Sequence, residues 1–425
     1  MYTELNTQPS LEETALKLEM HRFAAEVLRP ASLELDALPD PEQVIASGSV
    51  FWDVFRTYYR LGYHRSGLPE AVGGTPLSPL ARHIIAEEMG WGAADFAVGL
   101  GVASFPYSFA AMSGRPELLK AVTEFVEDTA AANIGCWAIT EPEHGSDLLM
   151  VGTPQFKEPA TSGAARARRD GDGWVISGQK SAWVSNGTIA THALAFLTAA
   201  PEEGPSGGVV AFIPLTAPGV TRGKPLNKLG QRALNQGEIF FDDVHLNSDY
   251  VVVPQKAYTY ALDSVLAGAN AFMGATFTGL ARAAFEEALE YARHRVQGGR
   301  PIANHQAIQL KLMDMFTKVE CARALSRSAS VYNAVTSPPS TQHSMASKVF
   351  CTQASFEVSS DALQVFGGYG LAKGMLVEKL LRDARAALIE DGTNEVLSLA
   401  AARKVIDSYA TGSRQSHSQP VPAGN

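Results

Sequence analysis

A chain of 425 residues, 46% of them hydrophobic, can bury a large apolar core, and we expect it to form about two to four folding units. Its net charge of −9 excludes general nucleic-acid binding, which needs clustered lysines and arginines to neutralise phosphates. Three scattered cysteines exclude a disulfide framework or a zinc site, and no membrane span or secretory signal is recognisable, which predicts a cytoplasmic protein.

Apolar residues recur at helical spacing through the first part of the chain. The spacing is clear over residues 11–30, where we expect Pro30 to end the helix, and it returns over 51–61 and 80–96. The sequence therefore predicts an α-helical N-terminal domain over residues 1–134.

Short β-prone runs, separated by Gly, Pro, Asp and Asn, come next. They are WVIS at 174–177, HALAFLTA at 192–199, GVVAFIPL at 208–215 and EIFFDDVHL at 238–246. Spacing of this kind predicts a central antiparallel β domain, over residues 135–248. Within it Arg166, Arg168 and Arg169 precede two aspartates, and we interpret these arginines as part of an exposed loop.

Helical spacing resumes at Ala257. Four long segments carry it, at 257–297, 305–334, 343–365 and 374–390. Consecutive amphipathic helices with short links predict an antiparallel four-helix bundle, here over residues 249–410. The polar stretch 411–425 predicts a disordered tail. The fold class is thus α+β with several domains.

The stretch RDARAALIEDGTNE, residues 382–395, holds an acidic pair at a helix break. A carboxylate at such a break, Glu390 or Asp391, can project into a cavity where burial tunes its pKa for proton abstraction. Asp-Gly is equally a common turn dipeptide, and Thr393 or Asn394 can cap the next helix. Taken alone, this stretch favours the turn.

Three other segments suggest ligand contacts and also have ordinary structural explanations. AITEPEHGSDLLM at 138–150 can hold the polar edge of a flat ligand or form a simple turn. In GQKSAWVSNG at 178–187, Trp183 and Ser185 share a face of an extended segment, which suits a stacked ring or a core tryptophan. GGYG at 367–370 follows no strand, so a dinucleotide-binding fold is rejected.

Seven motifs taken in order resemble the acyl-CoA dehydrogenase family across residues 15–408. They are ITEPEHGSD, GQKSAWVSNG, LGQRALNQGEIFFDDVHL, YARHRVQGGRPIANHQAI, QVFGGYG, EKLLRDAR and IEDGT. The resemblance implies a helical domain, a β domain and a four-helix bundle, in agreement with the periodicity above. It also implies FAD between the β domain and the bundle, an acyl-CoA or acyl-carrier-protein thioester as substrate, an electron acceptor such as an electron-transfer flavoprotein, and a homotetramer or dimer.

The same resemblance assigns residues to the cofactor. The flavin ring and ribityl chain are implied to lie against Trp137, Ile139, Thr140, Gly145 and Ser146. Trp183 packs at the isoalloxazine, and Ser185, where the family usually has Thr, hydrogen-bonds near N5. The pyrophosphate and adenosine half is implied to lie, across a subunit boundary, against Arg295, Gln364, Gly367 and Gly368. Thr393 and Glu395 match adenine-diphosphate contacts, and Glu395 replaces the more usual Gln.

The implied catalytic base is Asp391, which stands where the family usually has Glu. It would remove the α-proton of the acyl thioester while flavin N5 accepts the β-hydride. Because Asp is one methylene shorter, the carboxylate recedes by more than ~1 Å, which can lower a rate on the order of 10²-fold. We therefore expect an unusual acyl group, cyclic or branched, or a carrier-protein substrate. Glu390 remains the competing base, while Ala269 and Asn270 remove an alternative base and a usual arginine.

Two alternatives stay open. One is a flavin oxidase or monooxygenase on the same fold, of the nitroalkane-oxidase kind, although those enzymes carry an arginine where this chain has Ser398. The other is a non-catalytic scaffold without FAD, which Gly298 permits because it replaces an aromatic residue of the family at the bundle hairpin.

Overall fold

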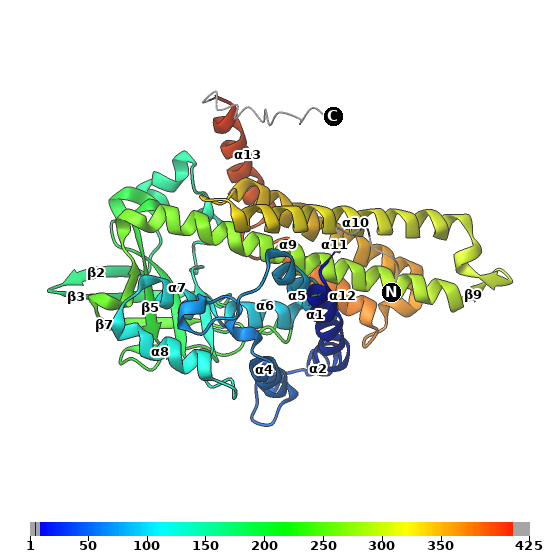
Figure 1. The fold of residues 1–425 in the computed structure, drawn as a ribbon, viewed down its shortest axis with the longest axis horizontal. Helices are drawn as coiled ribbons and strands as arrows, with labels where there is room; N and C mark the ends of the chain where they lie inside the picture. The colour runs from blue at the N-terminus through cyan, green and yellow to red at the C-terminus, as the bar shows by residue number, and fades with distance from the viewer. Residues whose placement is uncertain (1–4, 6–8, 411–425) are drawn as a thin grey trace, which may run out of the picture.

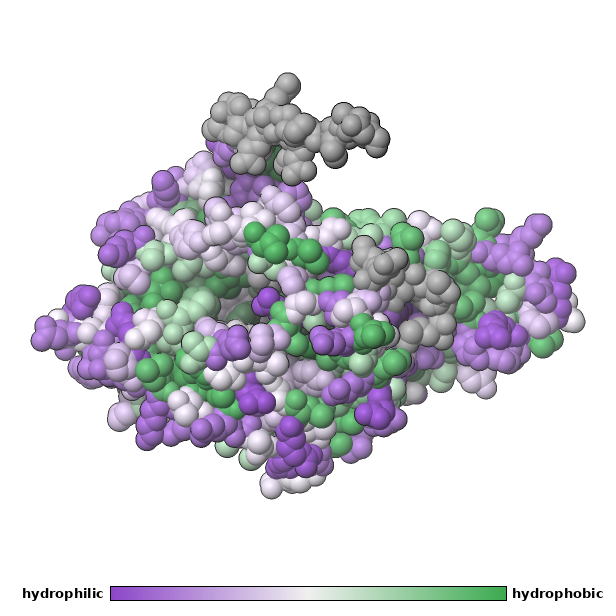
Figure 2. Space-filling view, viewed as in Figure 1, coloured by the Kyte–Doolittle hydropathy of each residue, from purple (hydrophilic) through white to green (hydrophobic). Residues whose placement is uncertain are grey.

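The computed structural model describes residue 5 and residues 9–410, so the predicted tail at 411–425 lies outside the described residues. The chain runs from a group of short helices through a sheet to a set of long helices (Figure 1). The sheet lies at one end of the molecule, and the long helices extend from it to the other end. Hydrophilic residues gather at these two ends and along the lower edge of the view, whereas hydrophobic residues reach the surface in the middle of this face (Figure 2). This order confirms the predicted α+β fold class.

The N-terminal helix passes through its proline. Helix α1 (Leu11–Phe23) continues through a π-helical segment, Ala24–Leu28, into α2 (Arg29–Asp36). The expectation that Pro30 ends the helix is therefore wrong. The wider π turn relieves the clash between the proline ring and the preceding turn, and Pro30 stands at the start of α2, where its missing N–H is tolerated.

The remaining N-terminal helices divide between the long helices and the sheet. They are α3 (Pro41–Val44), α4 (Val50–Arg60), α5 (Pro79–Gly92), α6 (Ala94–Val102), α7 (Phe105–Ser113) and α8 (Pro116–Glu127). Helices α5 and α6 pack on the first long helix, while α7 packs on the sheet and carries α8. The stretch Ala94–Ser113 is long and apolar enough to cross a membrane, but 61% of its most apolar window is buried inside the fold. Such burial is what a core helix shows.

The β domain is a mixed sheet. Its strands are β1 (Gly135–Ala138), β2 (Arg166–Asp170), β3 (Gly173–Lys180), β4 (His192–Thr198), β5 (Gly208–Pro214), β6 (Val220–Arg222), β7 (Ile239–Asn247) and β8 (Val251–Val253). The order is β6-β7-β3-β2-β4-β5-β8, with β1 beside β4. The predicted antiparallel arrangement holds for most neighbours, but β4 pairs in parallel with β1, with Gly135 opposite His192, and with β2, with Arg166 opposite Thr198.

The arginine cluster is a strand and not the predicted loop. Arg166 to Asp170 pair antiparallel with β3, and Arg166 lies opposite Ser177. Ala167 is buried in the sheet, while Arg168 and Arg169 are exposed. The high charge concealed a strand whose inward face rests on one small residue.

The C-terminal part contains the four predicted long helices and one more. The four are α9 (Gln255–His294), α10 (Gln306–Val335), α11 (Thr341–Phe366) and α12 (Leu376–Ala387). A fifth helix, α13 (Asn394–Ala410), follows the acidic pair and packs on α11. Between α9 and α10 a hairpin joins β9 (Val296–Gln297) to β10 (Arg300–Pro301). Its turn residues Gly298 and Gly299 have φ of 59° and 80°, a geometry that explains glycine at position 298.

A buried charge cluster fastens α5 to the long helices. We call Glu87, Glu88, Arg282 and Arg323 the Glu87 cluster. Arg282 donates to Glu87 at 3.1 Å and to Glu88 at 2.9 Å, and Arg323 donates to Glu87 at 2.9 Å. All four side chains are buried, so each charge meets an opposite charge without access to water.

Candidate active site

The acidic pair lies in the turn between α12 and α13. Asp391 adopts the left-handed region with φ of 53°, and Gly392 follows with φ of 96°. The backbone N–H of Asn394 donates to the carbonyl of Leu388 at 3.0 Å, which closes the turn. The Thr393 hydroxyl accepts from the next helix at 3.3 Å, as an N-cap does. The predicted turn and cap are both confirmed, and this turn presents the two carboxylates.

The two carboxylates differ in what holds them. Gln231, in the loop before β7, donates its side-chain N–H to Glu390 at 2.6 Å. The Asp391 carboxylate is half-buried and accepts no hydrogen bond from any residue in the described part of the chain. Burial and the neighbouring Asp391 charge raise the pKa of Glu390 to about 7. Burial also raises the pKa of Asp391 to about 6, against the opposing charge of Lys348.

A second face of the site comes from the β domain. Trp137 and Ser185 are paired by an isolated β-bridge, and a second bridge joins Ser185 to Gln236. Residues 182–183 form a turn rather than the predicted extended segment, because the N–H of Val184 donates back to Ser181 at 3.3 Å. Trp183 is 57% exposed, which rules out the core-tryptophan interpretation.

A buried ion pair holds these β-domain loops together. Lys180 donates to the Glu141 carboxylate at 2.8 Å and to the Ile139 carbonyl at 3.1 Å. The other Glu141 oxygen accepts from the backbone N–H of Ala165 at 3.0 Å. The N–H of Ser181 also donates to the carbonyl of Thr140 at 2.9 Å. Sequence reasoning missed Glu141 and Lys180, because nothing local distinguishes a buried pair from two surface charges.

The two faces meet at Ser146. The backbone N–H of Thr393 donates to the Ser146 hydroxyl at 3.0 Å, across the boundary between the bundle and the β domain. A side chain at Gly392 would come within 3.1 Å of Leu149 and 2.9 Å of Leu397, so glycine is needed for this close approach. The structure thus connects the predicted residues Thr140, Ser146, Ser185, Asp391 and Thr393 through the loops that carry them.

The remaining predicted cofactor residues form a separate group at the far end of the bundle. Tyr291 stacks on Phe366 with ring centres 4.0 Å apart, which joins the end of α9 to the end of α11. The members of this far-end group are exposed: Arg295, Gln364, Gly367 and Gly368. This end of α9 lies away from the sheet (Figure 1). Within one chain the predicted residues therefore fall into two groups. Glu395, which is exposed, lies in the first turn of α13 beside the first group.

The first group fits a flavin. Trp183 offers an exposed indole, and Ser185 offers a hydroxyl that the Gln236 amide approaches at 3.4 Å. The buried indole N–H of Trp137 has no partner in the described chain. No atom lies within 4 Å of the position that a side chain at Gly145 would occupy, which leaves room for a ligand against the backbone. A flat ring with a hydrogen-bonding edge matches this set of groups.

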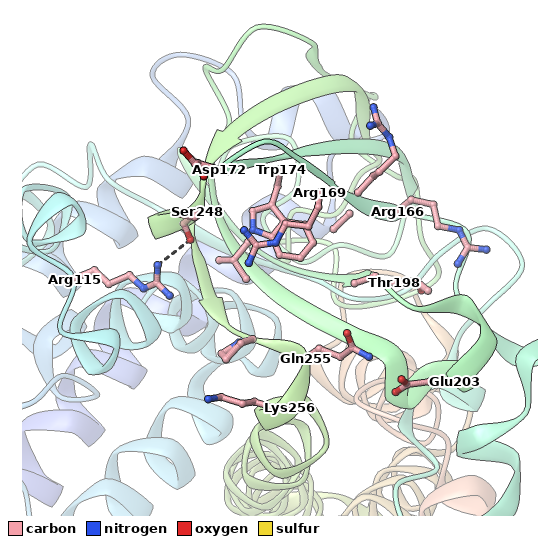
Figure 3. Close-up of a pocket in the computed structure, with 15 residues that line it drawn as sticks. Arg115, Arg166, Arg169, Asp172, Trp174, Thr198, Glu203, Ser248, Gln255 and Lys256 are labelled. Carbon is pink, nitrogen blue, oxygen red and sulfur yellow. Dashed lines mark hydrogen bonds between the residues drawn. The ribbon is translucent and has the colours of Figure 1, made fainter.

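A large hollow elsewhere on the β domain contains none of the predicted site residues. Its volume is about 1350 Å³, and it lies between the β2–β3 hairpin and the start of α9 (Figure 3). Five cationic side chains line it, and they are Arg115, Arg166, Arg168, Arg169 and Lys256. Arg115 is tied to the Ser248 carbonyl at 2.8 Å, and Arg169 covers Trp174 at 4.2 Å. The hollow is thus a separate basic surface.

Comparisons with known proteins agree with this geometry. Family models of the acyl-CoA dehydrogenase N-terminal, middle and C-terminal domains match residues 10–121, 136–244 and 259–406. Cyclohex-1-ene-1-carbonyl-CoA dehydrogenase of Geobacter metallireducens is 30% identical over 93% of this chain and 98% of its own length. The mitochondrial short-chain specific acyl-CoA dehydrogenase of Bos taurus is 32% identical over 82% of this chain and 81% of its own length.

Solved structures show the same fold. Butyryl-CoA dehydrogenase from Megasphaera elsdenii superposes with a TM-score of 0.82 at 24% identity, covering 95% of this chain and all of that one. The FAD complex of PigA superposes with a TM-score of 0.80 at 21% identity, covering 94% of this chain and 99% of that one. The chain belongs to the acyl-CoA dehydrogenase family, a family of FAD-dependent oxidoreductases that act on CH–CH bonds.

Proposed function

We propose that the chain dehydrogenates an acyl-CoA thioester between its α and β carbons, with Asp391 as the base that removes the α-proton. One observation carries the choice of base. Gln231 engages the Glu390 carboxylate at 2.6 Å, whereas the Asp391 carboxylate accepts no hydrogen bond within the described chain. A carboxylate without a hydrogen-bond partner can turn toward a substrate, whereas a carboxylate held by a hydrogen bond is less free to do so.

The surroundings of Asp391 suit proton abstraction. Its pKa of about 6 keeps it mostly ionised at neutral pH and makes it a stronger base than an ordinary aspartate. Its backbone N–H donates to no group in the described chain, so this N–H is available to polarise the thioester carbonyl. When bound, FAD supplies the acceptor for the β-hydride.

The acyl group that we propose is cyclic or branched. The short side chain of Asp391 requires the α carbon to come closer to the turn than a glutamate would. Two relatives support this choice by name. Cyclohex-1-ene-1-carbonyl-CoA dehydrogenase and cyclohexane-1-carbonyl-CoA dehydrogenase of Geobacter metallireducens are 30% and 29% identical over 93% and 92% of this chain. These names also favour CoA over a carrier protein as the thioester carrier.

The assembly that we propose is a homotetramer or dimer. The far-end group lies at the opposite end of the bundle from the sheet, so it would serve the FAD of another subunit. An electron-transfer flavoprotein is the proposed electron acceptor. The alternative, a flavin oxidase of the nitroalkane-oxidase kind, would have an arginine at position 398. Here Ser398 supplies no positive charge, and its hydroxyl donates to the Asn394 carbonyl at 2.7 Å.

The test is a panel of straight, branched and alicyclic acyl-CoA thioesters added to the FAD-loaded protein. We expect loss of flavin absorbance that is fastest with an alicyclic thioester. Asp391→Asn should slow this reduction by about 10²- to 10⁴-fold, whereas Glu390→Gln should leave most of it, because general-base catalysis is lost only in the first variant. Flavin reduction that survives in Asp391→Asn and disappears in Glu390→Gln would reverse the assignment. Rapid reaction of the reduced protein with oxygen would favour the oxidase.

A further inference from the structure

Behind the acidic turn lies a buried lysine that sequence reasoning did not single out. Lys348 lies in α11, and its side chain is fully buried. Its Nζ donates to the Gly392 carbonyl at 2.8 Å and to the Asn394 side-chain oxygen at 2.8 Å. Within the described chain it makes no direct ion pair, although its charge is out of water. A buried ammonium that meets only neutral oxygens is costly, so a nearby negative charge must compensate it.

The carboxylates of the acidic turn supply that negative charge without contacting Lys348. Burial lowers the pKa of Lys348 to about 8, and the charges of Asp391, Glu390 and Glu395 oppose this shift. In return the charge of Lys348 favours the charged form of Asp391. Glu390 also faces Lys228, from the loop before β7, whose own pKa burial lowers to about 8. Lys348 is thus the cation of the acidic turn on the α11 side.

The contacts of Lys348 fall on the two residues that fix the turn and not on the carboxylate. Gly392 follows Asp391 directly and Asn394 lies three positions after it. Asp391 itself holds a left-handed conformation that costs energy for a residue with a side chain. A direct ion pair would occupy the lone pairs of the base. A lysine bonded to the next carbonyl leaves those lone pairs open while it still provides the field.

We propose that Lys348 is a positioning residue for the reaction, which holds the left-handed turn of Asp391 through Gly392 and Asn394 and keeps the Asp391 carboxylate ionised without touching it. This inference rests on the proposed role of Asp391. A purely structural lysine would explain the two hydrogen bonds but would predict no change in the titration of the base.

The experiment compares Lys348→Met, Lys348→Gln and Lys348→Arg with the natural protein from about pH 5 to about pH 9. Flavin reduction by the best thioester is followed at each pH. We expect the acid limb of the rate to move up by about one pH unit in Lys348→Met and Lys348→Gln, because the favourable charge is lost. Lys348→Arg should stay near the natural limb. Lys318→Met is the matched control, because Lys318 on α10 already pairs with Asp314 and Glu357 at 2.8 and 2.9 Å.

A second readout needs no activity. In a double-mutant cycle, Asp391→Asn should recover part of the thermal stability lost in Lys348→Met. Lys348→Met leaves the Asp391 charge without an opposite charge, and the second substitution removes that charge. An acid limb that stays in place in Lys348→Gln, or losses that simply add in the cycle, would overturn the inference. Should Lys348→Met not fold, Lys348→Gln alone decides. Failure of the proposed function is distinguished by the natural protein, whose flavin would then remain oxidised with every thioester.

Discussion

Two buried charge clusters of this protein are built on opposite plans. In the Glu87 cluster every carboxylate meets a guanidinium directly, at 2.9 to 3.1 Å. We call Lys348, Glu390 and Asp391 the Lys348 cluster. Its lysine forms no hydrogen bond to either carboxylate, and the hydrogen bonds of Lys348 and Glu390 are made with neutral groups. The carboxylates of the Glu87 cluster are fully buried, whereas Glu390 and Asp391 are half-buried, so the two clusters differ in pairing and also in exposure.

The pairing decides how each cluster titrates. Burial raises the pKa of Glu87, but Arg323 and Arg282 outweigh it and hold this pKa well below the usual range. In the Lys348 cluster burial wins, and the pKa values of Asp391, Glu390 and Lys348 come to about 6, 7 and 8. Direct pairing locks charges for structure, whereas indirect compensation leaves groups that exchange protons near neutral pH.

The largest expected effect comes from breaking the paired cluster. Arg282→Met leaves Glu87 and Glu88 buried with one cation fewer, and we expect it to lower the free energy of unfolding by about 3–5 kcal/mol. Denaturant unfolding of the FAD-loaded protein measures this change. Arg293→Met is the matched control on the same helix, since Arg293 pairs with Glu290 at 3.1 Å on the surface and should cost at most about 1 kcal/mol. Equal effects of the two variants would contradict the comparison.

A smaller effect is expected from releasing Glu390. Gln231→Leu removes the hydrogen bond that lowers the pKa of Glu390, and it should cost about 1–3 kcal/mol of stability because a half-buried carboxylate loses its partner. Flavin reduction should remain within about tenfold of the natural rate, since Asp391 is untouched. Gln353→Leu is the control, because Gln353 donates to Glu357 at 2.8 Å on an exposed face of α11. A collapse of flavin reduction in Gln231→Leu would mean that Glu390 takes part in the chemistry.

The residues of these clusters also show where sequence reasoning succeeds and stops. The Gly392 break and the Thr393 cap are local, so the backbone preferences of neighbouring residues predict them. The domain order and four helices follow from periodicity over long segments. Lys348, Gln231 and Glu141 act through partners from about 25 to about 160 positions away, and no local pattern marks them. The loop predicted at Arg166 to Arg169 was wrong for a different reason. The charged residues there do not resemble a strand, yet pairing with neighbouring strands stabilises one.

The smallest effect concerns stability, and its sign separates the two clusters. The folded pKa of Asp391 lies above its ordinary value, so the folded state binds the proton more tightly and loses stability as pH rises from about 4 through about 6. Glu87 behaves oppositely, because its lowered pKa contributes stability above about pH 4.5 that is lost on acidification.

Asp391→Asn removes the loss of stability at rising pH that Asp391 causes, and it leaves the loss on acidification that Glu87 causes. We therefore expect its thermal midpoint to exceed that of the natural protein by a few degrees at about pH 8, and the difference to vanish near about pH 4. Thermal unfolding of the flavin-free forms measures it, and Asp314→Asn, at an exposed ion pair, should show no such gain. A midpoint that falls at about pH 8 in Asp391→Asn would mean that the Asp391 charge stabilises the fold. The contrast with the Glu87 cluster would then disappear, because a base that stabilises its own fold when ionised is a paired structural charge.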